Sequence, residues 1–242
     1  MNAEGRNRSA GMTTSQIATM LSALKPKLLE GLSSAEVESI SEAATWKQYD
    51  TNSLITREGE IADRLFLMLS GSARYYTMSP QGTKVIVFWI RPGELIGGAS
   101  LLSKREEYVM SAEAVRKTSV LEWDRTVARS LAAASPRLVE NALLLAYDYL
   151  ITYRIRHVAL RCNSAPQRVA QVLGFLAREM GKKAPKGGME LQIKNEDLAH
   201  EANVTIFTVS RLMGEWQRKG LLKKGRGSVV VMRPEVFFRL KA

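Results

Sequence analysis

The amino-acid sequence predicts an α+β protein in which a β-rich domain is followed by a long helix and then by a helix-turn-helix unit. Between about Thr45 and Trp123, short apolar runs alternate with turns that contain Gly or Pro, which is typical of a β-sandwich or barrel. A long helical pattern begins after Ser135. The stretch 194–222 then reads as two short helices joined by a tight turn.

Residues 15–44 precede the β-rich part and are predicted to be helical, with an interruption at Pro26. Ser33 and Glu36 have the spacing of a capping box, which begins a short helix. The residues before this stretch are polar and small. We therefore expect residues 1–14 to form a disordered tail rather than a secretion signal.

The β-rich part is predicted to hold short strands that end at turns such as Ser79–Gly82 and Arg91–Gly93. A stretch of about 80 residues with this punctuation is long enough for one compact β domain. The predicted strands are 54–57, 65–69, 72–78, 85–90 and 119–123.

A long helix is predicted from Pro136, with Ser135 as its cap and Pro136 at its first position. It contains too many apolar residues for a single buried stripe, so we expect it to have two packing partners. One partner is the β domain. The other is either the same helix in a second subunit or further packing within one subunit. Asn163–Pro166 break the helix and form a predicted hinge, after which a new helix buries Val169, Val172, Leu173 and Leu176.

The helix-turn-helix prediction rests on residues 194–222. Leu198, Ala199 and Ala202 recur at helical spacing, 203–205 form the turn, and Thr205 can cap the second helix. That helix has a complete buried stripe and an outer face that carries Ser210 and Arg211, as DNA reading by this unit requires. An ordinary helical hairpin packed in a core remains an alternative. The predicted stripe is Val209, Leu212, Met213 and Trp216.

Basic charge is concentrated beside this unit. The net charge is +11; residues 161–242 hold 16 Lys/Arg against 7 Asp/Glu, whereas residues 1–160 hold 19 against 17. Local basic charge favours nucleic acid through phosphate neutralisation, although a generic basic surface is the simpler alternative. A basic turn at 223–227 leads into a predicted strand at 228–232, so a β hairpin stands beside the two helices, as in a winged helix.

Several classes of protein are excluded by composition and motifs. No apolar run is long enough for a membrane helix, and one cysteine, Cys162, excludes an internal disulfide or a multi-cysteine metal site. The sequence lacks a nucleophile elbow, a P-loop and metal-ligand spacing, so we expect no enzyme and no resident cofactor. A cytoplasmic location without membrane contact is the simplest expectation.

Three short segments, in this order, resemble the Crp/Fnr family of bacterial transcription regulators over nearly the whole chain. They are LSGSARYY at 69–76, PGELIGG at 92–98 and TVSRLMGEWQRKGLL at 208–222. The resemblance implies an α+β fold with an antiparallel, jelly-roll-like β-roll as sensor, a long central dimerisation helix and a winged helix-turn-helix. It also implies a homodimer that binds double-stranded DNA at a near-palindromic operator and contacts RNA polymerase.

Together these observations predict a division of the chain into four parts. Residues 1–14 are the tail, and 15–134 form the helical lead-in and the cyclic-nucleotide-binding-like β-roll. Residues 135–163 form the dimerisation helix, and 164–242 form the winged helix-turn-helix domain. The competing function is a small-molecule or cyclic-nucleotide binding module whose basic helical tail is not a specific DNA reader.

The predicted DNA contacts divide into base readers and phosphate contacts. Arg211 suits the two major-groove acceptors of guanine. In the family, a polar or charged residue commonly stands where this chain has Ile206 and Phe207, which either contact a thymine methyl or leave the base unread. The operator preference should therefore differ from the usual one. The base readers are Ile206, Phe207, Ser210 and Arg211; the phosphate and wing residues are Lys194, Thr205, Thr208, Arg218, Lys223, Lys224 and Arg226.

The predicted effector pocket departs from the cyclic-nucleotide-binding members of the family. Those members supply a Glu for the ribose and an Arg-Ser pair for the phosphate. Here no Glu follows Gly98 directly, either Tyr108 or Met110 takes the place of the arginine, and Ser111 matches the serine. Without the guanidinium a cyclic phosphate lacks its bidentate partner, and Arg105 or Arg116 could replace it only by a different geometry. The predicted pocket residues are Gly97, Gly98, Ala99, Ser100, Tyr108, Met110 and Ser111.

Other sensing chemistries find less support, and the effector is unknown. An iron–sulfur sensor needs several cysteines, and a haem sensor needs a ligand such as His157. The default roles are a buried or hinge thiol for Cys162, a surface position for His157, and solvent or phosphate contact for His200. A redox role for Cys162 and binding of DNA without any effector both remain open.

Overall fold

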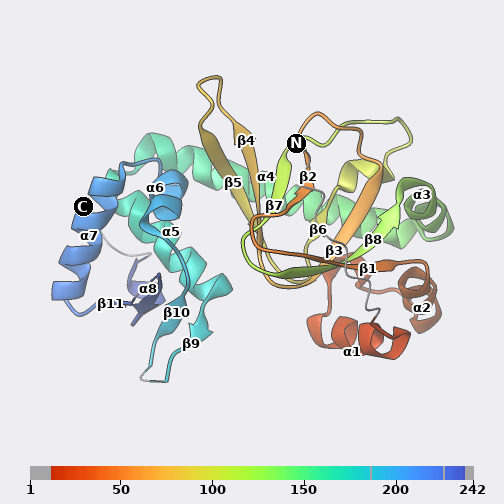
Figure 1. The fold of residues 1–242 in the computed structure, drawn as a ribbon, viewed down its shortest axis with the longest axis horizontal. Helices are drawn as coiled ribbons and strands as arrows, with labels where there is room; N and C mark the ends of the chain where they lie inside the picture. Colours follow the sequence, from red (N-terminus) through yellow and green to blue (C-terminus); the bar gives the residue numbers. More distant parts are fainter. Residues whose placement is uncertain (1–11, 186, 226, 238–242) are drawn as a thin grey trace. The chain divides into compact units, whose positions relative to one another are not determined.

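Two compact units make up the described part of the chain, and they divide inside one helix, between Leu150 and Ile151 (Figure 1). The structure is a computed structural model that describes residues 12–185, 187–225 and 227–237. Most of the predicted tail, and Arg226 of the predicted wing, therefore lie outside the described residues. The predicted α+β class is confirmed by the architecture of the two units.

The first unit begins with helices α1 (Thr14–Leu24), η1 (Lys27–Leu29) and α2 (Ser34–Glu42). Helix α1 starts inside the predicted tail because Thr13 and Gln16 form a capping box. The capping box predicted for Ser33 and Glu36 is confirmed: the backbone N–H of Glu36 donates to the Ser33 hydroxyl, and that of Ser33 donates to the Glu36 carboxylate.

Two four-stranded antiparallel sheets follow, with strand orders β1-β8-β3-β6 and β2-β7-β4-β5. In the register between β3 and β8, Leu67 is opposite Leu121 and Arg64 is opposite Asp124. The strands are β1 (Thr45–Tyr49), β2 (Leu54–Thr56), β3 (Arg64–Ser70), β4 (Ala73–Met78), β5 (Lys84–Ile90), β6 (Leu95–Ile96), β7 (Ser111–Ala114) and β8 (Thr118–Asp124), with the short helix η2 (Gly98–Leu101) after β6.

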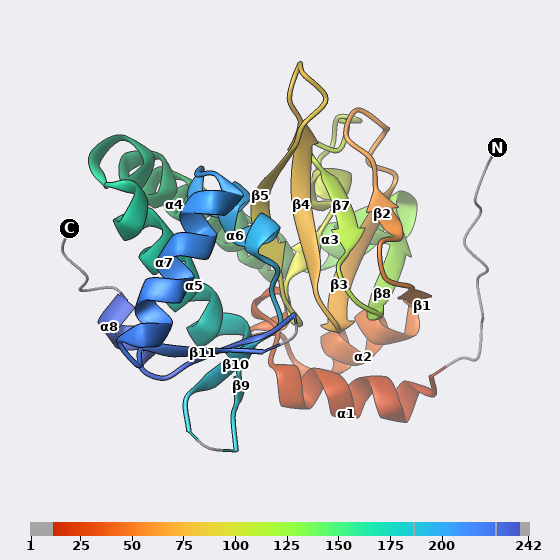
Figure 2. The same ribbon diagram turned by 60° about the vertical axis from the view of Figure 1, so that its left-hand side comes forward.

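The continuous apolar run in β3 is explained by burial on both faces. Phe66 and Met68 face the second sheet, where they pack with Ile90 of β5 and Ala112 of β7. Leu65, Leu67 and Leu69 face the helices, including α1 and α2 (Figure 2). The first sheet is therefore the middle layer of this unit.

Strands β1, β6 and β7 and helix α3 of this unit were not predicted. Strand β6 has two residues, and β7 has the sequence SAEA, which has little β propensity. β7 forms because β2 and β4 pair with it on either side. Helix α3 (Arg125–Ala134) also went unrecognised; it buries Ala128 among the residues that face the first sheet.

Helix α4 (Pro136–Cys162) begins at the predicted proline. The Ser135 hydroxyl donates a hydrogen bond to Glu36 Oε1 at 2.8 Å. Leu138, Asn141 and Leu145 are the buried residues of α4, and the Asn141 amide donates to the backbone oxygens of Leu28 and Glu30. Other apolar residues of α4, such as Leu143 and Leu150, are exposed. The helix therefore has an apolar surface beyond the face that it buries.

The second unit places helices beside a small sheet of order β11-β12-β10-β9. Helix α5 buries Val169, Leu173 and Leu176, as predicted, whereas Val172 is half-buried. The break predicted at 163–166 is confirmed, since α4 ends at Cys162. The elements are α5 (Ala165–Met180), β9 (Lys182–Lys183), β10 (Met189–Leu191), α6 (Asn195–Ala202), α7 (Ile206–Arg218), β11 (Leu222–Lys224), β12 (Val229–Val231) and α8 (Pro234–Phe237).

Candidate nucleic-acid interface and ligand pocket

The turn between α6 and α7 is held by backbone geometry and by one cap. Asn203 adopts a left-handed conformation with φ of 49°, which a helix C-terminus favours and which asparagine tolerates well. The hydroxyl of Thr205 accepts from the backbone N–H of Thr208 at 3.2 Å. The predicted turn and cap are therefore confirmed, and α7 begins at a defined residue.

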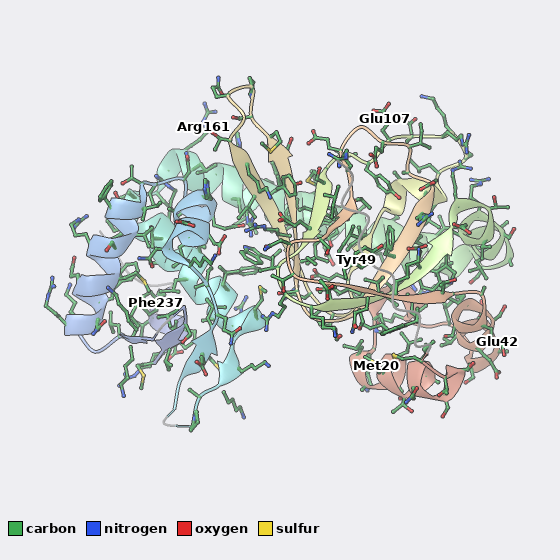
Figure 3. The ribbon with its side chains drawn as sticks, in the orientation of Figure 1. Met20, Glu42, Tyr49, Glu107, Arg161 and Phe237 are labelled. Carbon is green, nitrogen blue, oxygen red and sulfur yellow. The ribbon has the colours of Figure 1, made fainter. Side chains whose placement is uncertain are left out.

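The buried stripe predicted for α7 is confirmed at all four positions. Val209, Leu212, Met213 and Trp216 are each at most 4% exposed. The Trp216 ring packs edge-on against Phe237 of α8, which is labelled in Figure 3, with centroids 5.1 Å apart. This packing fixes which face of α7 points to solvent.

The four predicted base readers lie on the exposed part of α7. Ile206 is 46% exposed and Phe207 is 86% exposed, and Ser210 is also exposed. The Arg211 side chain is 66% exposed and lies 4.0 Å from the Glu215 carboxylate. Lys219 lies closer to the same carboxylate, at 2.7 Å, so Glu215 holds the Arg211 side chain only weakly.

The predicted phosphate contacts surround this face. Lys194, Thr205, Arg218, Lys223 and Lys224 are exposed, and Thr208 is half-buried. A Cβ placed at Gly214 would lie 3.8 Å from Arg218 Nη1 and 3.9 Å from Lys224 Nζ. Two cations, one from α7 and one from β11, therefore converge beside Gly214.

Arg168 is a positioning residue that the sequence pattern does not mark as functional. Its Nε donates to the carbonyl of Ala202 at 2.8 Å and its Nη2 to that of Asn203 at 3.0 Å. Its Nη1 donates to the carbonyl of Asn163 at 2.8 Å. One guanidinium on α5 therefore binds both the loop after α4 and the turn before α7. In the sequence it looks like any solvated helical arginine, because its partners are distant.

An ion pair also connects α4 to α6. Arg156 Nη1 lies 3.1 Å from Glu201 Oε2, and the Glu201 side chain is 1% exposed. A buried carboxylate needs a cation to offset its desolvation. The end of α4 is thereby attached to the first helix of the helix-turn-helix.

In the first unit, a cavity of about 240 Å³ lies against α4. Five of the seven predicted pocket residues line it: Gly97, Gly98, Ala99, Tyr108 and Met110. The other two do not. Ser100 is fully buried, and the Ser111 hydroxyl accepts from the backbone N–H of Glu58 at 3.0 Å.

Eight residues that were not predicted also line the cavity. Three are aromatic, namely Tyr75, Phe88 and Tyr149, and the others are Leu95, Val109, Ala142, Leu145 and Ala146. Burial raises the pKa of Tyr75 and of Tyr149, so both hydroxyls remain protonated at neutral pH. The Tyr149 hydroxyl is buried and has no hydrogen-bond partner among the described residues. Its O–H is therefore a donor that no described residue uses.

Tyr108 has a different role from the arginine that it replaces. Its hydroxyl accepts from the backbone N–H of Arg64 and donates to the carbonyl of the same residue. Its ring lines the cavity beside Gly97, whose φ is +80° and whose Cβ would lie 2.5 Å from the Arg64 carbonyl oxygen. Glycine is required here because both the backbone angle and the space exclude a side chain.

None of the described residues that line the cavity is charged. Arg105 is exposed, and Arg116 donates to the Ser72 hydroxyl at 2.8 Å. Neither lines the cavity, so neither supplies the guanidinium that a cyclic phosphate requires.

The remaining sensing candidates are not among the residues that line the cavity. Cys162 is exposed rather than buried. The ring of His157 stacks on Tyr153 with centroids 6.2 Å apart, and His200 is exposed. Within the described ranges, no group of three or more His, Cys, Asp or Glu could hold a metal ion, and no helix there is long and apolar enough to span a membrane.

Comparison with protein families gives one match in each unit. The cyclic nucleotide-binding domain family matches residues 46–135. The Crp-like helix-turn-helix domain family matches residues 167–238. The order of the two matches is the order of the β domain and the helix-turn-helix described above.

Relatives of the same kind cover most of the chain. The nitrogen fixation regulation protein FixK of Bradyrhizobium diazoefficiens is 26% identical over 204 residues, which are 84% of each chain. The cyclic AMP receptor protein of Thermus thermophilus is 28% identical over 204 residues, or 84% of this chain and 91% of the relative.

The fold also matches solved structures. FixK2 from Bradyrhizobium japonicum has a TM-score of 0.71 at 24% identity and covers 82% of this chain and 98% of that one. The c-di-GMP responsive regulator CLP of Xanthomonas campestris has a TM-score of 0.72 at 18% identity, covering 82% and 99%. Both domains, their order and these relatives place the chain in the Crp/Fnr family, whose members are DNA-binding transcription regulators and not enzymes.

Proposed function

We propose that this regulator acts in the cytoplasm as a homodimer that reads a near-palindromic operator, contacts RNA polymerase and uses its β-domain cavity as a sensor. The observation that carries the proposal is the exposed face of α7, where Arg211 and Ser210 stand clear of the core beside the converging cations Arg218 and Lys224. A two-fold dimer presents this face twice and so favours an operator with two related half-sites.

The dimer proposal is supported by the exposed face of α4. Regulators of this family typically bind DNA as dimers. On α4, residues at alternating steps of four and three are exposed, the spacing of a coiled-coil seam. Leu143 is 69% exposed and Leu150 is 62% exposed. The seam consists of Val139, Leu143, Ala146, Leu150, Tyr153, His157 and Leu160.

Direct base reading is assigned mainly to Arg211. Its planar guanidinium matches O6 and N7 of guanine, which is the commonest specific contact in the major groove. Lys194, Thr205, Thr208, Lys223 and the pair beside Gly214 would contact phosphates and set the register of the protein on the duplex.

We do not expect cyclic AMP to be the effector of this regulator. The Thermus relative is named for cyclic AMP, but the cavity of this chain is lined by apolar residues and tyrosines, without a charged side chain among the described residues. We propose that the cavity takes an uncharged small molecule that accepts a hydrogen bond from Tyr149. Calorimetric titration with cyclic AMP and cyclic GMP should give no tight binding; a saturable, tight isotherm would overturn this part.

Signal transmission is assigned to the end of α4. A ligand against α4 would shift the helix, and Arg168 and Arg156 would pass that shift to the helix-turn-helix through Asn163 and Glu201. A dimer reads both half-sites only when its recognition helices stand roughly 34–36 Å apart, so a small shift is enough to control binding.

The test of the DNA-reading proposal is selection of binding sites from random duplex DNA by the full chain. We expect a two-fold operator, recovered by a dimer in sedimentation analysis. Affinity should fall steeply between about 50 and 200 mM salt, because phosphate contacts release counterions. Recovery of random sequences with equal affinity would support the competing small-molecule binding module.

A further inference from the structure

Phe207 is unusually exposed for an aromatic residue that lies on a helix of a folded domain. It is 86% exposed, compared with 76% for Val109 and 69% for Leu143. Large apolar side chains are normally withdrawn from water. Ile206, the residue before it, is 46% exposed, so the two side chains form an apolar patch at the start of α7, and such a patch indicates a surface that another molecule covers.

The position of Phe207 on α7 indicates what that molecule is. Phe207 is the second residue of α7, directly after the Thr205 cap and Ile206. Arg211 lies one turn later on the same side of the helix. Gly214 and Arg218 follow on that side over the next two turns. Residues near the N-terminus of a recognition helix are those that reach base edges in the major groove.

The charges beside Phe207 point to DNA rather than to an apolar protein partner. Arg211 is on the same side of the helix, and Arg218 and Lys224 converge beside Gly214. A partner that buried Phe207 would also have to compensate these cations. The major groove of DNA provides both, because the phosphates that border it can pair with the cations and the base edges at its floor can cover Phe207.

Only one group on that floor suits a phenyl ring. Phenylalanine neither donates nor accepts a hydrogen bond, and the apolar group of the major groove is the C5-methyl of thymine. We propose that Phe207, flanked by Ile206, reads a pyrimidine 5-methyl group in each half-site, while Arg211 reads a neighbouring guanine. This inference rests on the proposed operator binding and names the specificity that distinguishes it.

The recognised feature is the methyl group and not the hydrogen-bonding pattern of the base. Deoxyuridine, which lacks the methyl, should be read poorly although it pairs like thymine. A 5-methylcytosine presents its methyl at the same position and should be read better than cytosine. A hydrogen-bonding residue at this position would show neither dependence.

The experiment uses the full chain and the operator obtained by selection. Each thymine of the half-site is replaced singly by deoxyuridine, in both half-sites, and dissociation constants are measured at one salt concentration. Loss of one buried methyl corresponds to about fourfold per half-site, so a doubly substituted operator should bind about 16-fold more weakly. The effect should be confined to the base pair that Phe207 covers.

Substitutions distinguish the contribution of the Phe207 ring from that of the other residues of α7. Phe207→Ala should bind thymine and deoxyuridine operators equally, and Phe207→Leu should keep part of the difference. Arg211→Ala is the matched control: it should weaken binding yet keep the full methyl dependence. Phe207→Glu should move the preference from thymine towards cytosine, because a carboxylate accepts from the cytosine amino group. Because Phe207 is exposed, the thermal midpoints of these variants should match that of the wild type.

Three outcomes would overturn the inference. The first is an operator in which no thymine responds to deoxyuridine. The second is a methyl dependence that survives in Phe207→Ala, and the third is a Phe207→Ala protein that binds the operator as tightly as the wild type. Each of these leaves operator binding intact and therefore leaves the proposed function standing. Failure to select any operator would instead reject the proposed function, and this inference with it.

Discussion

Nη1 of Arg156, on α4, lies 3.1 Å from Oε2 of Glu201, on α6, and the Glu201 side chain is 1% exposed. The long helix and the helix-turn-helix are thus joined by a charge pair with one almost fully buried member. Removing one partner from such a pair leaves a charge in a place that water does not reach.

Replacing Arg156 by Ala is therefore expected to destabilise the second unit. Because the Arg156 side chain is 28% exposed, we expect a loss of about 2 kcal/mol, below the range for fully buried pairs. Urea denaturation would measure it. Arg154→Ala, on an exposed position of the same helix, should be nearly neutral, and Arg156→Met combined with Glu201→Met should recover part of the loss. Equal losses for Arg154 and Arg156 would contradict the assignment.

The base-reading role of Arg211 predicts a loss that depends on sequence. Arg211→Ala should weaken operator binding by roughly 1–3 kcal/mol and relax the preference at one base position. Lys223→Ala should weaken binding to all sequences alike and reduce the slope of the salt dependence by about one. Competition assays with single-base operator variants would measure both. If Arg211→Ala weakened all sequences alike, Arg211 would be a phosphate contact.

The exposed seam of α4 predicts that dimerisation depends on Leu143. Leu143→Glu would place a carboxylate where a second copy of the helix packs, so the dimer should dissociate and operator affinity should fall by more than tenfold, or about 1.4 kcal/mol. The monomer should keep its fold because Leu143 is exposed. Sedimentation velocity and circular dichroism would measure the two effects. Arg154→Glu, outside the seam on the same helix, is the control that should remain dimeric.

Replacing a tyrosine of the cavity by phenylalanine should have opposite effects on stability at Tyr108 and at Tyr149. The Tyr108 hydroxyl bonds twice to the Arg64 backbone, so Tyr108→Phe should cost about 1–3 kcal/mol, since it removes a hydrogen-bond partner from two partly buried backbone groups. The Tyr149 hydroxyl has no partner among the described residues, so Tyr149→Phe should be neutral or slightly stabilising in the ligand-free protein. Urea denaturation of both variants provides the comparison. A large loss for Tyr149→Phe would show that its hydroxyl is bonded within the protein.

Local sequence signals predicted the elements that local interactions define. The capping box of Ser33 and Glu36, the start of α4 at Pro136 and the cap at Thr205 each involve residues within one turn of each other. Strand β7, with the small residues SAEA, escaped prediction because its neighbours in the sheet, and not its own side chains, hold it in place.

The candidate sites divide in the same way. The exposed face of α7 follows from helical periodicity alone, because the positions of Val209, Leu212, Met213 and Trp216 determine which residues are left outside. The cavity could be placed only in part, since Tyr75, Phe88 and Tyr149 reach it from distant segments. Arg168 and Arg156 could not be recognised, because an arginine on a helix has the same local pattern whether it is solvated or bound.

The sequence by itself therefore determined the order of the domains, the reading face of α7 and the concentration of basic charge beside it, since each depends on spacing or composition within a short stretch. Tertiary structure alone decided which charges are buried, which hydroxyls lack partners and where the cavity lies. Desolvation and hydrogen bonding depend on distances between residues such as Arg168 and Asn203, which are close in space because the chain has folded and not because they are near in sequence.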